Sequence, residues 1–231
     1  MFKELEIINK IEHKEKFIKL VENFSYAKEQ INAPVTVGEF YEACKNYPIV
    51  FAKDKDNVWF ASVMLGFKEN ENIFVDEKGE WEKLHYIPAA IRRYPFIFIN
   101  QEKSDDLILG IEKSYLSSDK KDESRKLFEK EDNSELLNNV LNFLNQFQND
   151  AKVTSNFIKQ LEEWGLLEEK VATITTASKE QYNINGFFVV NEDKLRHLSK
   201  KRKEEICEKD MIPLITAHLI SLSNIQKLGI K

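Results

Sequence analysis

The most regular pattern in the first half of the chain is a series of short apolar segments separated by polar turns. Residues 48–52, 58–65 and 72–75 are rich in β-branched and aromatic side chains, which favour strands. Residues 54–57 and 68–72 separate them with the Asp and Asn side chains typical of turns. This alternation predicts an antiparallel meander. The side chains expected to be buried in it are Ile49, Phe51, Phe60, Val63, Leu65 and Phe74. Further strands are expected at residues 4–9, 97–99, 107–111, 171–175 and 186–190.

Helix signals lie on both sides of these strands. Thr36 and Glu39 have the spacing of a capping box, and apolar residues at helical spacing continue to Pro48. Ser134 precedes a longer amphipathic run that ends near Gly165, and glycine commonly follows the last turn of a helix. Other helices are expected from the first strand to about Glu22, from Asn191 to Leu198, and from Leu214 to Gly229.

These elements predict an α+β fold, with an antiparallel β meander in the N-terminal half and a helical C-terminal half packed on it. A chain of 231 residues with 42% hydrophobic side chains can bury a substantial core. We expect a single domain over residues 1–231. The strongly charged segment at about 119–135 is expected to be an exposed excursion, with Leu127 and Phe128 as the side chains that can dock onto the body.

The charge pattern argues against nucleic-acid binding. The formal net charge is −5, with 34 basic residues among 39 acidic ones. Nucleic-acid binding usually needs a basic patch, and the best local candidate, residues 200–203, is followed at once by Glu204 and Glu205. No nucleic-acid partner is therefore expected. The chain has no membrane span of about 20 apolar residues and no secretory signal, so a cytoplasmic location is expected.

Four segments carry a resemblance to a known family. They are residues 47–51 (YPIVF), 72–81 (NIFVDEKGEW), 86–96 (YIPAAIRRYPF) and 218–224 (HLISLSN). In this order they resemble the SapC family, and the resemblance extends over nearly the whole chain. It implies one SapC-like domain and a bacterial surface-layer connection, because the family is named after a locus for surface-layer protein and its secretion machinery. It implies no particular reaction and supplies no catalytic residue.

The strongest candidates for a ligand site are Arg92 and Arg93, two adjacent cations in an apolar, aromatic segment. Burying a guanidinium is unfavourable unless an anion compensates it. Neighbouring helix residues diverge by about 100°, so one arginine can point inward while the other meets solvent. An inward arginine suits the capture of a carboxylate or phosphate. The alternative is an internal salt bridge, for which the nearest carboxylates are Glu39, Asp76 and Glu80.

Three other residues have both a structural and a ligand-binding interpretation. Residues 76–79 are expected to form a tight turn in which Gly79 takes a positive φ, and Asn72 and Asp76 could bind backbone amides of this turn or face a ligand. His218 lies on an apolar helix face, which is more typical of a hydrogen-bonded core histidine. The chain has no zinc spacing, no EF-hand and no glycine-rich phosphate loop, so no metal and no cofactor are predicted.

Two functions of different classes remain open from the sequence. The first is a non-catalytic accessory protein that binds a polypeptide partner connected with surface-layer assembly or export. The second is an enzyme with a dispersed site, with or without a metal, built from His13, Asp76, Arg92 or His218. A structural component of the layer is disfavoured, because such proteins are rich in Gly and Thr and this chain is charged and poor in Gly. The oligomeric state is left open.

Overall fold

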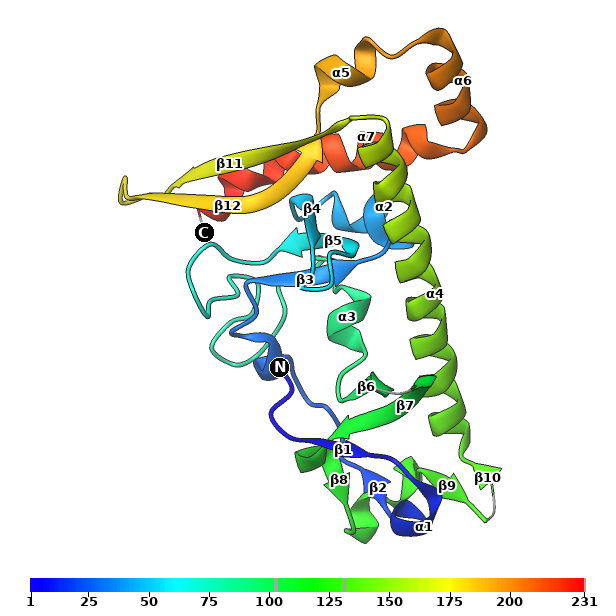
Figure 1. Ribbon diagram of the computed structural model, residues 1–231. Helices are drawn as coiled ribbons and strands as arrows, with labels where there is room; N and C mark the ends of the chain where they lie inside the picture. Colours follow the sequence, from blue (N-terminus) through cyan, green and yellow to red (C-terminus); the bar gives the residue numbers. More distant parts are fainter. Residues whose placement is uncertain (102–103, 131, 231) are drawn as a thin grey trace.

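The larger of two main sheets contains five antiparallel strands in the order β11-β12-β4-β5-β3 (Figure 1). The structure is a computed structural model that describes residues 1–101, 104–130 and 132–230. β4 and β5 form the central hairpin, with Ile49 opposite Val63. The strands are β3 (Asn32–Val35), β4 (Ile49–Lys53), β5 (Trp59–Met64), β11 (Leu167–Thr175) and β12 (Gln181–Val190).

The predicted meander is correct for its first two strands and wrong for the third. Residues 72–75 form no strand; instead Asn72 accepts a hydrogen bond from the amide of Phe74 and closes a local turn. The neighbour of β5 is β3, which contains Pro34. Proline cannot donate a ladder hydrogen bond, so it is compatible with this edge position but weakens the strand signal in the sequence.

The predicted division into an N-terminal sheet and a C-terminal helical half is also wrong. The hairpin β11–β12 joins the same sheet from the second half of the chain, where Phe188 pairs with Phe51 of β4. Helices alternate with strands along the whole sequence. The α+β class is confirmed, but as a mixed arrangement with several antiparallel sheets.

Short helices cover the larger sheet and close its core. The capping box is present, since Glu39 accepts a hydrogen bond from the amide of Thr36. Ser221 accepts a hydrogen bond from the amide of Ile49 and so joins α7 to β4. Five of the six side chains expected in this core are buried, and Phe60 is half-buried. The elements are η2 (Val37–Glu39), α2 (Phe40–Ala43), α5 (Glu192–Arg196), α6 (Lys200–Glu208), α7 (Met211–Ser221), η5 (Leu222–Asn224) and α8 (Ile225–Leu228).

A second, smaller sheet lies at the other end of the molecule, in the order β1-β7-β6 (Figure 1). Its strands confirm the predictions near residues 4–9, 97–99 and 107–111. The helical stretch predicted to Glu22 is wrong beyond His13, because the chain turns there into β2. The strands of this end are β1 (Leu5–Ile7), β2 (Phe17–Ile18), β6 (Phe96–Gln101), β7 (Ser104–Glu112), β8 (Leu116–Ser117), β9 (Phe128–Glu129) and β10 (Asp132–Asn133), with the helices α1 (Lys10–His13), η1 (Ser25–Ala27), η3 (Lys113–Tyr115) and η4 (Lys120–Arg125).

The long helix α4 (Glu135–Glu163) runs beside both sheets (Figure 1). Ser134 caps it by accepting a hydrogen bond from the amide of Leu137, and Gly165 follows it with a φ of +68°. Leu137 and Leu144 pack in the core of the smaller sheet, and residues 157–161 contribute to the core of the larger one. The single-domain organisation stays a prediction, and this shared helix is the feature that supports it.

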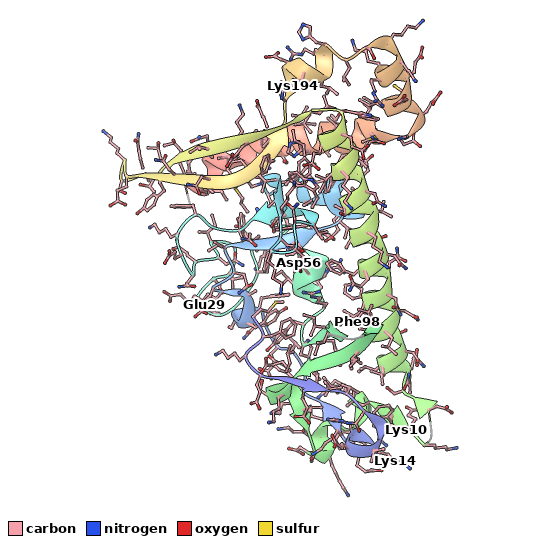
Figure 2. All side chains as sticks on the ribbon, in the orientation of Figure 1. Lys10, Lys14, Glu29, Asp56, Phe98 and Lys194 are labelled. Carbon is pink, nitrogen blue, oxygen red and sulfur yellow. The ribbon has the colours of Figure 1, made fainter. Side chains whose placement is uncertain are left out.

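The charged segment at 119–135 combines exposed and buried side chains. Lys120, Lys121 and Glu123 are exposed, whereas Leu127 and Phe128 are buried against the smaller sheet. The two ends of the molecule are marked by Lys194 on α5 and Lys10 on α1 (Figure 2). None of the helices in the described part of the chain combines the length and the apolar composition needed to cross a bilayer.

Candidate functional site

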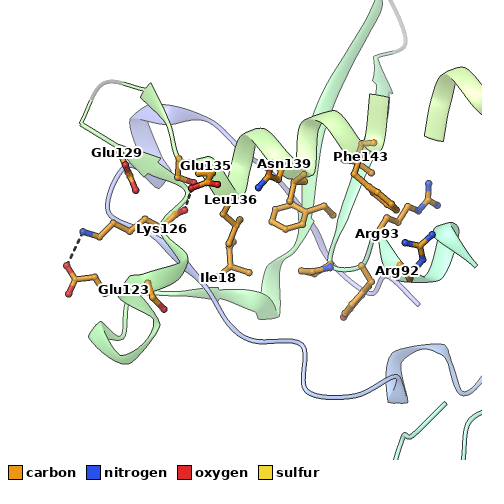
Figure 3. Close-up of a pocket in the computed structure, with 17 residues that line it drawn as sticks. Ile18, Arg92, Arg93, Glu123, Lys126, Glu129, Glu135, Leu136, Asn139 and Phe143 are labelled. Atoms are coloured by element: carbon orange, nitrogen blue, oxygen red, sulfur yellow. Dashed lines mark hydrogen bonds and ion pairs between the residues drawn. The ribbon is translucent and has the colours of Figure 1, made fainter. Parts of the chain in front are cut away.

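A cavity of about 840 Å³ opens between the first half of α4 and the segment that carries Arg92 and Arg93 (Figure 3). We call it the α4 cavity. This volume lies within the range of ordinary ligand pockets. Its apolar lining includes Ile18 and Pro95, together with the α4 side chains Leu136 and Val140. The other lining residues are Arg92, Arg93, Tyr94, Phe96, Glu123, Ser124, Lys126, Glu129, Ser134, Glu135, Asn139, Phe143 and Leu144.

Local structure places the two arginines at one end of this cavity. The short helix α3 (Ala89–Arg92) buries Ala89, Ala90 and Ile91, so the following positions face α4 instead of the core. The chain then turns at Tyr94 and Pro95 into β6. Figure 3 shows both arginines beside Phe143, at the opposite end from Glu123 and Glu129.

Arg93 is half-buried and forms no hydrogen bond to an acceptor among the described residues. Its Nε atom is buried without a hydrogen-bond partner, and the guanidinium forms no ion pair with any described carboxylate. The guanidinium carbon lies 5.3 Å from the ring centre of Phe147 on α4, which is a cation–π distance. Burial lowers the pKa of this guanidinium, because the charged form is poorly solvated there. Arg93 is therefore a positive group whose compensation is incomplete.

Arg92 is exposed and is held by neutral acceptors. Its Nε donates to the carbonyl oxygen of Ile87 at 3.0 Å, and its Nη2 donates to the hydroxyl of Tyr86 at 3.2 Å. The guanidinium carbon lies 5.5 Å from the ring centre of Phe143. Nη1 forms no hydrogen bond with a described residue. These contacts fix the guanidinium at the end of the cavity and leave part of its donor capacity unused.

Glu39 supports this end of the cavity without pairing directly with either arginine. It is buried, and its Oε1 accepts from the Tyr86 hydroxyl at 2.9 Å and from the amide of Ala89 at 2.7 Å. Its Oε2 accepts from the amide of Thr36 at 2.8 Å. Burial raises the pKa of Tyr86 to about 12, and the charge of Glu39 and the hydrogen bond to it act in the same sense, while Arg92 opposes them. Glu39 thus links the capping box to the residue that orients Arg92.

Replacing Glu39 with glutamine is expected to lower the free energy of unfolding by roughly 1–3 kcal/mol. The reason is that the NH2 group of glutamine would point at a hydrogen-bond donor to which the carboxylate oxygen is now the acceptor. The measurement is urea unfolding. Glu42→Gln is the matched control, since Glu42 lies three residues further on with an exposed side chain paired to Lys45. Equal stability of the two variants would contradict the supporting role of Glu39.

Asn72 and Asp76 lie outside this cavity and have local partners. Asn72 is buried and donates to the carbonyl oxygen of Ala27 at 3.1 Å. Asp76 accepts from the amides of Lys78 and Glu80, at 2.9 and 2.8 Å, and so closes the predicted turn. Gly79 has a φ of +79°, as this turn requires. The geometry at both residues is that of a backbone turn.

His218 lies in the core of the larger sheet, away from the α4 cavity. It is fully buried, its Nε2 accepts from the amide of Val190 at 3.0 Å, and its ring stacks on Phe51 with 4.5 Å between ring centres. Burial lowers its pKa to about 3, and a polar contact with the backbone of Ile49 offsets this only in part. The ring is therefore neutral at ordinary pH.

The structure brings together some predicted residues and adds others. Arg92 and Arg93 share one cavity, whereas Asn72 and Asp76 lie together in the turn segment at 72–80 and His218 lies in the core of the larger sheet, all outside that cavity. Sequence reasoning did not single out Tyr86, Lys126, Glu129, Glu135 or Phe143. The sequence did contain one sign of this site: Phe143 and Phe147 are one helical turn apart, and in the structure each of them contacts one of the two arginines. Among the residues described, no group of three or more His, Cys, Asp or Glu side chains could hold a metal ion.

Comparison with known proteins gives a match to a family model. No curated protein and no solved structure is similar to the chain. The family model described as SapC matches residues 8–228, a range that includes α3, α4 and every residue that lines the α4 cavity. The chain therefore belongs to the SapC family.

Proposed function

We propose that this SapC-family chain is a non-catalytic accessory protein that binds a polypeptide partner in the α4 cavity. The observation that carries the proposal is the Arg93 guanidinium at the end of the cavity, which has a buried Nε without a partner and no ion pair with any described carboxylate. A structural arginine in such a place would normally have acceptors within the protein. An anionic group from a partner would supply the missing ones.

The biological setting of the partner is part of the proposal. The SapC family takes its name from a surface-layer locus, and this supports a partner connected with surface-layer assembly or export. A cytoplasmic site of action is proposed with it. The α4 cavity suits this role because apolar side chains in its middle can bury part of a bound chain while charged groups at both ends orient it.

The enzyme alternative has less support from the arrangement of its residues. His13 lies on α1 and His218 on α7, at opposite ends of the molecule (Figure 1). Asp76 is engaged with its own turn. No observation on the described residues joins these groups to Arg92 in one reacting centre.

Photo-crosslinking tests the proposal in the cells that normally contain the protein. A photoreactive amino acid at Asn139, which lines the cavity, is expected to give a polypeptide adduct (Figure 3). The same group at Lys152, an exposed position more than three turns further along α4 and outside the cavity lining, is the control. The adduct at position 139 should disappear in the Arg93→Gln variant, which should remain folded. Absence of the adduct at position 139, or equal adducts at both positions, would contradict the proposal.

A further inference from the structure

Charge is separated along the α4 cavity. Arg92 and Arg93 occupy one end, and Glu129 and Glu135 lie toward the other (Figure 3). Lys126 lies at this second end, but its Nζ is 3.0 Å from Oε1 of Glu123, which balances it. Neither Glu129 nor Glu135 has an ion-pair partner among the described residues, although the charge of Glu129 also acts on Lys126. Among the lining residues, one end of the cavity therefore carries two arginines, and the other carries three carboxylates and one lysine.

The distance between the two ends can be measured along α4. Glu135 marks the negative end and Phe143, which contacts Arg92, marks the positive end. Eight residues of α-helix rise by about 12 Å. An extended polypeptide advances about 3.3 Å per residue, so about four residues cover this span. The side chains between the ends, from Leu136 to Val140 and Ile18, are mainly apolar.

From this arrangement we infer that the α4 cavity recognises a short extended peptide with a carboxylate at one end, a cationic side chain about four residues away, and apolar residues between them. The inference rests on the proposed function and specifies its ligand. A carboxylate matches the guanidinium donors that the protein leaves unused, and bidentate pairing with arginine favours it. The cation is placed beside Glu129 and Glu135, where a purely anionic ligand would be repelled.

The cation–π contacts explain why the positive end can discriminate between ligands. Phe143 and Phe147 hold the two guanidinium groups against α4, so less side-chain freedom remains to be lost when a ligand binds. The hydrogen bonds from Arg92 to Ile87 and Tyr86 also restrict the freedom of this side chain before a ligand binds. A positioned pair of this kind recognises the planar carboxylate more strongly than a neutral amide of the same size.

Calorimetry with the full chain and four acetylated tetrapeptides tests the inference. The first is Lys-Leu-Phe-Leu with a free carboxyl end, the second is its carboxyl-terminal amide, and the third has Glu in place of Lys. The fourth, Lys-Leu-Phe-Asp with an amidated end, offers a side-chain carboxylate instead of a terminal one. We expect the amide of the first peptide to bind about tenfold more weakly, in keeping with the loss of a charge-assisted hydrogen bond. The Glu peptide should also bind more weakly, and comparison of the first and fourth peptides identifies the source of the carboxylate.

Protein variants assign these preferences to the two ends. Arg93→Gln should weaken binding of the first peptide about tenfold and remove the difference between acid and amide. Glu135→Gln should reduce the preference for Lys over Glu. Lys120→Gln removes an exposed cation outside the cavity and is the matched control. Equal affinities for acid and amide, or no binding of any carboxylate peptide, would overturn the inference. Crosslinking at Asn139 would still decide the proposed function separately.

Discussion

Replacing Phe74 with alanine is expected to lower the free energy of unfolding by about 3–5 kcal/mol. The side chain is only 3% exposed, and its ring packs edge-on against Tyr47 with 4.7 Å between ring centres. Tyr47 is itself fully buried, with its hydroxyl donating to the carbonyl oxygen of Tyr86 and accepting from the indole nitrogen of Trp81. These hydrogen bonds hold Tyr47 in place, so the cavity left by the missing ring would collapse only in part.

Urea unfolding at neutral pH measures this loss. Leu84→Ala is the control, because Leu84 is fully exposed and also lies in a loop of the same region. Its substitution should change stability by no more than about 0.5 kcal/mol. A loss below about 1 kcal/mol for Phe74→Ala would mean that the segment at 72–75 packs less tightly than its burial indicates.

The second large effect is a dependence of stability on pH that originates at His218. Burial lowers the pKa of this ring to about 3 in the folded chain, whereas an ordinary histidine has a pKa of 6.5. Unfolding therefore takes up a proton between these values, and acid favours the unfolded chain. The contribution of neutral His218 is complete above pH 6.5 and is lost as the pH falls toward 3. The free energy of unfolding should decrease by about 1.4 kcal/mol per pH unit from this group alone.

Comparison of wild type with His218→Gln isolates that contribution. Glutamine can still accept the hydrogen bond from the amide of Val190 but does not titrate. The variant should be less stable at pH 7, because the ring contact with Phe51 is lost, and its stability should fall less steeply between pH 6 and pH 4. His197→Gln removes an exposed imidazole and controls for the substitution itself. An unchanged slope in His218→Gln would show that other groups cause the acid sensitivity.

Much of the local structure could be predicted because its determinants lie within a few residues of each other. The capping box at Thr36 and Glu39, the cap of α4 at Ser134 and the helix stop at Gly165 each depend on one turn of backbone. The hairpins β4–β5 and β6–β7 join strands that are neighbours in the sequence. Local propensity and short loops favour such elements whatever the rest of the chain does.

The arrangement of strands in the larger sheet could not be predicted in the same way. Residues 72–75 have the composition of a strand, but the backbone partner next to β5 is the proline-containing β3. The other side of β4 is occupied by β12, which lies more than a hundred residues further along the chain. Strand pairing over such separations depends on which apolar faces can be buried together, and this information is not local.

In the candidate site, too, some features follow from local sequence and others from contacts between distant parts of the chain. The sequence by itself determined that two adjacent arginines lie in an apolar segment, that α4 is a long amphipathic helix, and that His218 lies on an apolar face, because composition and spacing express these properties. Only the tertiary structure decided that Arg93 contacts Phe147 and pairs with none of the described carboxylates. It also decided that Glu39 is linked to Arg92 through Tyr86, and that Glu129 and Glu135 lie at the far end of the same cavity. The reason is that solvation and charge pairing of a side chain are set by groups brought together from distant parts of the chain.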